Sequence, residues 1–350
     1  MNSSEEELIV QKLSEYGLNT FLLTKDEYLA NNPWAYETYE TLQTWSTNAG
    51  IILALNTESY LSGVAIWKPK TIVLSASSFP DAMSLGYIIA KYIHDKEPIQ
   101  HSPAQAGKKS CYTNFYDENG LPKYIDLALA EVSSDSDIAK NLKQIASLFI
   151  FFLYLHESAH IHYRHGSRND SIEQDAAVSS RGKFNSEKDA KEKHARELVC
   201  DSYALKLFLT EYVKHFLPES ESEQIKYLSW QFAVIGLKFY FMEGTMGRND
   251  FPLRHYPPSE FRMQHLYMDL IYENVLGLSE FVVHQVVRVS KKLTQKVLED
   301  VFNDPIAKEW MSNKDIDTKY ADWYENHVFP ILKDWAPYQS VQCDGASIVP

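Results

Sequence analysis

Cysteine is scarce in this chain, which has only Cys111, Cys200 and Cys343 among its 350 residues. They are odd in number, widely spaced and never in a CxxC pair, which argues against a disulfide framework and a thiolate metal site. The first residues, MNSSEEELIVQKL, are acidic and lack a basic region followed by an apolar core, so we expect no signal peptide. Together these absences predict a cytoplasmic protein.

The chain also has fewer positively than negatively charged residues, and it has no long apolar run. The chain has 34 Lys and Arg against 47 Asp and Glu, a formal net charge of -13. This charge argues against nucleic acid as a partner, because a phosphate backbone would be repelled. The longest apolar run, 145–155, is about half the length that a bilayer requires, so we expect no membrane span. The composition predicts no particular oligomeric state.

What the chain does contain is typical of a globular protein. Hydrophobic residues make up 45% of it and charged residues 23%, and its length is enough to bury a sizeable core. The stretch VAIWKPKTIVLSAS (64–77) has two β-branched runs broken by Pro69, which predicts strands or a hairpin. The polar stretch 167–193 predicts a surface loop that leads into a helix. Helices are predicted over 81–97, 137–166, 186–216, 221–244, 259–276, 279–303 and 315–335.

The sequence HESAHIHYRHG contains the pattern H-E-x-x-H, formed by His156, Glu157 and His160. Residues four apart lie on one face of a helix, so the two imidazoles can reach one zinc ion. Glu157 beside them can accept a proton from a water on that ion. His162 and His165 follow on the same helix and are interpreted as polar residues of its end. The alternative is an accidental match in a solvated helix end.

A catalytic zinc ion usually has three protein ligands and one open position, so a third ligand is needed. A metzincin would have histidine six positions after the second motif histidine, where this chain has Gly166. Downstream, HARELVCDSYALKLF places Glu197 and Asp201 four apart among apolar residues, where a carboxylate is costly unless it is paired or binds metal. Glu197 is the candidate third ligand, and Asp201 the candidate acceptor for the second N–H of a ligand histidine. The alternative is a pair of surface acids, with Glu197 partnering Arg196 or Lys193.

H-E-x-x-H on one helix with E-x-x-x-D on a following helix resembles the gluzincins, the thermolysin-like zinc peptidases. The resemblance implies a zinc cofactor held by His156, His160 and Glu197, with Glu157 as general base and Asp201 behind a ligand histidine. HESAHIHYRHG and RELVCDSYAL look most similar to compact relatives of the CAAX-processing and heat-shock membrane proteases, and to the soluble Lit-type peptidases of bacterial phage exclusion. The soluble branch is preferred, because the chain lacks the spanning helices of the membrane relatives.

The segment RHYPPSEFRMQHL (254–266) resembles the T-H-P-P-x-x-x-R segment that these peptidases carry after the zinc ligands. Alignment on the two prolines and Arg262 puts Tyr256 where the family has histidine, and His255 one position earlier. Either side chain is a candidate donor to a developing oxyanion, and Arg262 is expected to pair with an acid near the site or to hold the loop. The alternative is a proline-bounded helix start capped by Ser259. The resemblance covers about 140–270.

The predicted fold class is α+β and predominantly α-helical, with a small N-terminal β-containing part. We expect an α/β region of unknown role at 1–130, a zincin-like metallopeptidase core with the active-site helix at 131–275, and a helical region packed on that core at 276–350. The predicted function is zinc-dependent hydrolysis of a protein or peptide substrate, with Glu157 as general base, and the resemblance implies a role in phage exclusion. Two alternatives stay open: a catalytically inactive, zinc-stabilised protein-interaction module, and a hydrolase of another amide bond.

Overall fold

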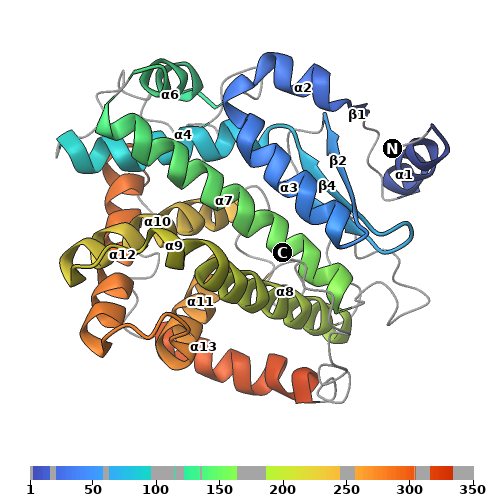
Figure 1. Cartoon of the computed structure of the whole chain (residues 1–350). Helices are drawn as coiled ribbons and strands as arrows, with labels where there is room; N and C mark the ends of the chain where they lie inside the picture. Colours follow the sequence, from blue (N-terminus) through green and yellow to red (C-terminus); the bar gives the residue numbers. More distant parts are fainter. Residues whose placement is uncertain are drawn as a thin grey trace.

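The structure, a computed structural model, describes residues 3–15, 21–57, 63–95, 115, 122–134, 136–163, 187–244, 257–302, 304 and 316–333. Most of these residues are helical, and the strands form one small sheet near the N-terminus (Figure 1). This confirms the predicted α+β class in which helix predominates. The described α-helices are α1 (Ser3–Glu15), α2 (Lys25–Asn31), α3 (Tyr36–Asn48), α4 (Ser78–Asp95), α6 (Ile125–Val132), α7 (Asp137–His162), α8 (Glu187–Leu207), α9 (Lys214–Phe216), α10 (Glu221–Gly244), α11 (Ser259–Glu273), α12 (Glu280–Asp300) and α13 (Ile316–Trp323), with π-helical turns at Phe208–Val213 and Tyr324–Val328.

The sheet has four strands in the order β1 (Leu22–Leu23), β2 (Ile52–Asn56), β4 (Thr71–Ser75) and β3 (Gly63–Ile66). Strands β2 and β4 are parallel, whereas β1–β2 and β3–β4 are antiparallel pairs. The strands predicted within 64–77 are β3 and β4, joined by a turn that contains Pro69. Strand β3 lies at the edge of the sheet and, among the described residues, pairs only with β4.

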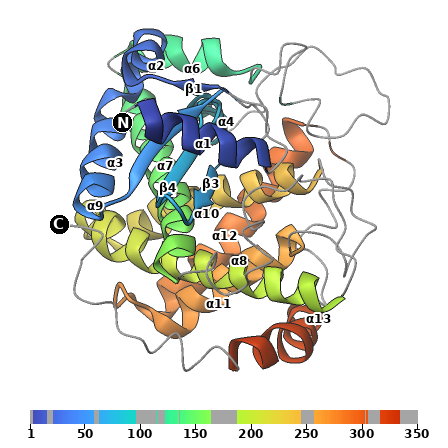
Figure 2. The ribbon, with the colours of Figure 1, turned by 90° about the vertical axis from the view of Figure 1, so that its right-hand side faces the viewer.

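The two faces of the sheet pack against different layers, because successive side chains of a strand point to opposite faces. Leu55 and Leu74 face the large helical core. Ala54 and Val73 face the other way and pack against Ile9 of α1. Helix α1 therefore covers the outer face of the sheet, and Figure 2 shows it in front of the strands.

Helix α7 runs through the middle of the molecule (Figure 1). Ser136 caps its N-terminus, where the Ser136 hydroxyl accepts the Ala139 amide at 3.0 Å. The helix packs against α3, α4, α6, α8, α10 and the edge strand β3. Because neighbours surround it, the apolar run 145–155 shows no single apolar stripe.

Over Ile138–His162, helix α7 also has the length and hydropathy of a membrane-spanning helix, and no other described helix does. Within its most apolar window, 61% of the residues are buried inside the protein. A core helix of a globular protein meets the same criteria, so α7 is weak evidence for a membrane span.

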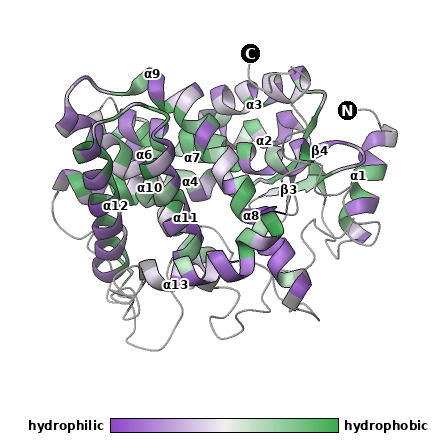
Figure 3. Cartoon of the chain, turned by 90° about the horizontal axis from the view of Figure 1, so that it is seen from below, coloured by the Kyte–Doolittle hydropathy of each residue, from purple (hydrophilic) through white to green (hydrophobic). Residues whose placement is uncertain are grey.

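The C-terminal half is built around α10, which packs against α4, α7, α11 and α12. Helix α13 packs on α8 through a separate apolar cluster of Ala195, Leu198, Tyr320, Trp323 and Val328. In Figure 3, hydrophilic residues are prominent along α12 at the rim of the molecule, and hydrophobic residues gather towards its interior. The main buried core draws residues from all three of the ranges 1–130, 131–275 and 276–350, whose boundaries stay a prediction.

Two predicted element boundaries differ from the structure. Helix α7 ends at His162, and the expected end at Gly166 lies outside the described residues. Helix α8 begins at Glu187, one residue after the predicted helix start at 186, so only the last residues of the overlapping predicted loop 167–193 are helical. The polar composition of this stretch conceals which side of the helix is buried, because the buried face is made of alanine and charged residues such as Ala190 and Lys193 rather than large apolar ones.

A buried pair of hydroxyl groups joins α7 to α3. The Ser46 and Tyr154 oxygens lie 2.8 Å apart, and both side chains are fully buried. We predict that Tyr154→Phe lowers the free energy of unfolding by about 1–3 kcal/mol, because the Ser46 hydroxyl loses this partner. Chemical denaturation measures the change, with Tyr272→Phe at a 76% exposed side chain as the control. An unchanged denaturation midpoint in Tyr154→Phe would contradict the prediction.

Candidate metal centre

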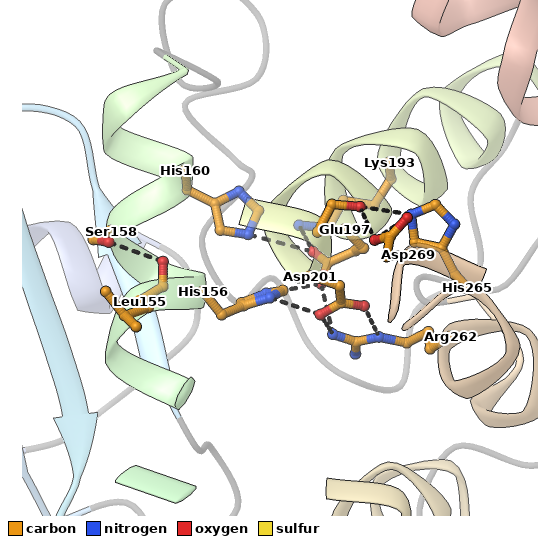
Figure 4. Close-up of polar contacts among 11 residues, drawn as sticks. Leu155, His156, Ser158, His160, Lys193, Glu197, Asp201, Arg262, His265 and Asp269 are labelled. Atoms are coloured by element: carbon orange, nitrogen blue, oxygen red, sulfur yellow. Dashed lines mark hydrogen bonds and ion pairs between the residues drawn. The ribbon is translucent and has the colours of Figure 1, made fainter. Parts of the chain in front are cut away.

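Helices α7 and α8 lie side by side and bring the two sequence motifs together (Figure 4). His156 and His160 come from α7, and Glu197 comes from α8. The Nε2 atom of His156 lies 3.3 Å from Oε2 of Glu197, and Nε2 of His160 lies 3.7 Å from Oε1. One donor atom from each residue lies within 4.8 Å of the other two, so this cluster could hold a metal ion.

The donor atoms lie at or beyond the separations found in a tetrahedral metal site. Bonds of about 2.0–2.1 Å in a tetrahedron place neighbouring donor atoms about 3.3 Å apart. The observed separations of 3.3 Å and 3.7 Å involve different oxygens of Glu197, and one donor atom from each residue lies within 4.8 Å of the other two, so the side chains would have to close around a single ion. Two imidazoles and one carboxylate are also ligand types that bind divalent transition metals.

Small residues between the two histidines allow α7 to pack closely behind the cluster. Ser158 and Ala159 are both fully buried. The Ser158 hydroxyl donates to the Leu155 carbonyl oxygen at 2.8 Å within the helix, so it needs no partner outside it. The Ser158 hydroxyl is therefore buried without being left unsatisfied.

Asp201 lies behind His156, on the side of the ring away from the cluster. Its Oδ1 atom is 2.9 Å from Nδ1 of His156. The angle at the ring does not suit a hydrogen bond, and the contact is an ion pair when the ring is protonated. Arg262 binds Asp201 with two bonds of 2.7 Å, from Nε to Oδ2 and from Nη2 to Oδ1. The Arg262 guanidinium also lies 4.0 Å from the ring centre of Phe239. These contacts limit the positions that the His156 ring can take.

Arg262 reaches this site from the first turn of α11. The structure thus combines both sequence interpretations of the segment, since α11 does begin after Pro258 and its arginine does pair with an acid of the site. Ser259 does not cap the helix, and its hydroxyl donates to Glu260 at 3.3 Å instead.

Lys193 is a buried cation beside the cluster. Its Nζ atom lies 2.9 Å from Oε1 of Glu197, one helical turn away, and only 7% of its side chain is exposed. Sequence reasoning raised Lys193 only as a partner for a surface acid, but Glu197 is 2% exposed. Both oxygens of Glu197 therefore face positively charged or metal-binding groups.

Burial and neighbouring charges perturb the protonation of the cluster. Burial by itself lowers the pKa of His156, but the carboxylates of Asp201 and Glu197 outweigh it and raise that pKa to about 9. Burial holds the pKa of His160 well below its usual value. Burial would raise the pKa of Glu197 and Asp201, yet Lys193, Arg262 and the histidines outweigh it and lower both.

The Glu157 side chain lies against the backbone of Gly63, and Glu157 is 8% exposed. Burial, the largest cause, raises its pKa to about 7, and the nearby Glu197 adds to this effect. A carboxyl group with a pKa near neutrality can both accept and return a proton under physiological conditions.

A second polar cluster lies beyond the site, where α8, α11 and α13 meet. Ser202 donates to Oδ2 of Asp269 at 2.6 Å and lies 2.8 Å from Nε2 of His265, whose Nδ1 is 2.6 Å from the Tyr320 hydroxyl. The serine lies between the histidine and the aspartate, whereas a nucleophilic triad needs the histidine in the middle. We therefore interpret the cluster as a link between the three helices.

The remaining histidine and tyrosine candidates of the sequence are His162, His165, His255 and Tyr256. His255, Tyr256 and His165 lie outside the described residues. His162 stacks against the ring of Tyr203, with 5.1 Å between ring centres, rather than facing the three donors. Sequence reasoning did not find Phe239 or Gly63, which have no motif around them and reach the site only through the fold.

Comparisons with models of known families, with curated proteins and with solved structures found no match. The chemistry of the site is therefore derived from the cluster itself.

We predict that metal affinity rises with pH up to about 9. A metal ligand must be unprotonated, so below the His156 pKa of about 9 a proton competes for its ring. Each pH unit below that value should weaken apparent binding by up to about tenfold. Competition between the protein and a chelator for Co²⁺ measures this. In Asp201→Asn the rise should level off at lower pH, and an affinity that does not change with pH in the native protein would refute the prediction.

We predict that Lys193→Met destabilises the metal-free protein and tightens metal binding. Without the ammonium group, Glu197 is a buried carboxylate with too little positive charge nearby, at a cost on the order of 3 kcal/mol, which a divalent cation would offset. Thermal melting with and without Co²⁺ measures both effects. Lys206→Met, on the same helix with a 62% exposed side chain, is the matched control. Equal metal affinities in the two variants would disprove that Lys193 competes with the metal ion for Glu197.

Proposed function

We propose that this protein is a zinc-dependent peptidase that hydrolyses a protein or peptide substrate. The observation that carries the proposal is the position of Glu157, a buried carboxyl group with a pKa of about 7, next in sequence to one donor of a His156, His160 and Glu197 cluster. Two histidines and one glutamate form a common ligand set of catalytic zinc in peptidases.

Zinc bound to these three residues would lower the pKa of a water molecule and polarise a substrate carbonyl group. Glu157 takes the proton of the attacking water at its carboxylate and passes it to the leaving nitrogen. Asp201 and Arg262 hold the ring of His156 in position, which supports its second nitrogen as a ligand. His255 and Tyr256 remain the proposed hydrogen-bond donors to the oxyanion that develops on the substrate carbonyl group.

The edge strand β3 supports an extended peptide as the substrate. Among the described residues its outer edge is unpaired, and it begins at Gly63, whose backbone lies against the Glu157 side chain. An extended peptide can add to such an edge through main-chain hydrogen bonds. Its peptide bonds would then run past the proposed general base.

A zinc-stabilised interaction module is the competing proposal. A structural zinc site is usually closed by four protein ligands, and the cluster found among the described residues has three. A buried carboxyl group beside the cluster has no purpose in a purely structural site. Both features favour catalysis. A cytoplasmic role in phage exclusion is proposed on the motif resemblance alone.

We predict that Glu157→Gln retains the metal and loses hydrolysis by on the order of 10²–10⁴-fold, because the amide cannot accept the water proton. Cleavage of a mixed peptide library by the zinc-loaded protein, followed by mass spectrometry, measures turnover, and metal analysis measures loading. Glu273→Gln, at an exposed surface position, is the control. The proposal fails if the zinc-loaded native protein cleaves nothing, or if Glu157→Gln cleaves as fast as the control.

A further inference from the structure

Gly63, the first residue of β3, lies unusually close to the general base. A Cβ atom added at this position would lie 2.8 Å from Cγ of Glu157, 3.0 Å from Oε1 and 3.1 Å from Cδ. Carbon atoms in contact are normally about 3.5–4.0 Å apart, so a methyl group here would overlap the Glu157 side chain. Nothing larger than a hydrogen atom fits between strand and base.

Glycine is required at position 63 because there is no room for a side chain, and not because of the backbone conformation. The positive-φ glycines among the described residues are Gly50 and Gly277, and Gly63 is not one of them. It pairs with Leu74 in regular antiparallel register. Glycine weakens a strand because it has no side chain to pack, and it often marks a close approach to another group.

The close approach also restricts where Glu157 can move. Its side chain lies between the start of β3 and the turn of α7 that carries His156, and both elements pack directly on each other. A Cβ at Gly63 would meet Cγ, Cδ and Oε1, so the Gly63 backbone runs alongside most of the Glu157 side chain. The backbone of Gly63 thus forms one wall of the space that holds the carboxyl group.

We propose that Gly63 is a positioning residue for Glu157: the missing side chain leaves a slot that holds the carboxyl group in place beside the turn of α7 that carries His156. This inference rests on the proposed peptidase function, because it assigns Gly63 a role in turnover through the general base. It further predicts that a side chain at position 63 displaces Glu157 without disturbing His156, His160 or Glu197.

The first test measures the steric contact and needs neither metal nor substrate. Gly63→Ala is made in the native, Glu157→Gln and Glu157→Ala backgrounds, and thermal melting is compared without metal. Gln keeps the three atoms that a Cβ would meet, whereas Ala removes them. Gly63→Ala should lower the melting temperature in the native and Gln backgrounds and cost clearly less in the Ala background. An equal cost in all three backgrounds would overturn the proposal.

The second test measures positioning in the zinc-loaded protein. Gly63→Ala should lower kcat on the order of 10²-fold while KM and zinc affinity stay near native values, because the base is displaced and the ligands are not. Gly86→Ala is the matched control: its Cβ would lie 3.0 Å from Cδ1 of Leu142, in the core between α4 and α7, and kcat should be unchanged.

The outcomes separate the two proposals. Native protein without turnover refutes the peptidase function, whereas the melting comparison still decides whether the slot exists. Native turnover with an unchanged kcat in Gly63→Ala refutes the positioning role alone. A further outcome is that Gly63→Ala alone does not fold. In that case, folding of the double variant Gly63→Ala with Glu157→Ala supports the contact between the two residues. Failure of both variants to fold overturns the proposal, because glycine is then needed only for the strand.

Discussion

The contact between α7 and α8 places acidic side chains inside the protein, and the site is organised around neutralising them. Glu197 and Asp201 are almost completely buried, and an uncompensated buried carboxylate is far more costly than most single contacts can offset. Compensation comes from Lys193 at 2.9 Å, from the twin bonds of Arg262, and from the histidines of the H-E-x-x-H motif. A metal ion bound by Glu197 would add to this compensation.

This constraint explains why elements distant in sequence converge on one helix pair. Helix α11 supplies Arg262, and α10 supplies the Phe239 ring on which its guanidinium lies. Helix α13 is tied to α8 and α11 through His265 and Tyr320. On the other side, β3 reaches Glu157 at Gly63. The ligands come from two helices, but their positions depend on three further helices and one strand.

Several parts of the fold and site follow from local pattern. The α+β class, the strand pair within 64–77 and the long helices are visible in the periodicity of the sequence. The polar stretch before Lys193 is a different case. Helix α8 begins there close to its predicted start, but its inward face carries charged residues and alanine, so a hydrophobic pattern could not show which side of the helix is buried. Lys193 itself looks like a surface residue until Glu197 is known to be buried.

The sequence by itself determined which residues can act together within one helix. Spacing by four puts His156 above His160, and Glu197 above Asp201, because the α-helical repeat is local geometry. Only the tertiary structure decided that these two helix faces meet, that Arg262 and Phe239 stand behind Asp201, and that Gly63 lies against Glu157. Those contacts join residues far apart in the chain, and they depend on how the edge of the sheet and the helices pack around α7, which no local repeat encodes.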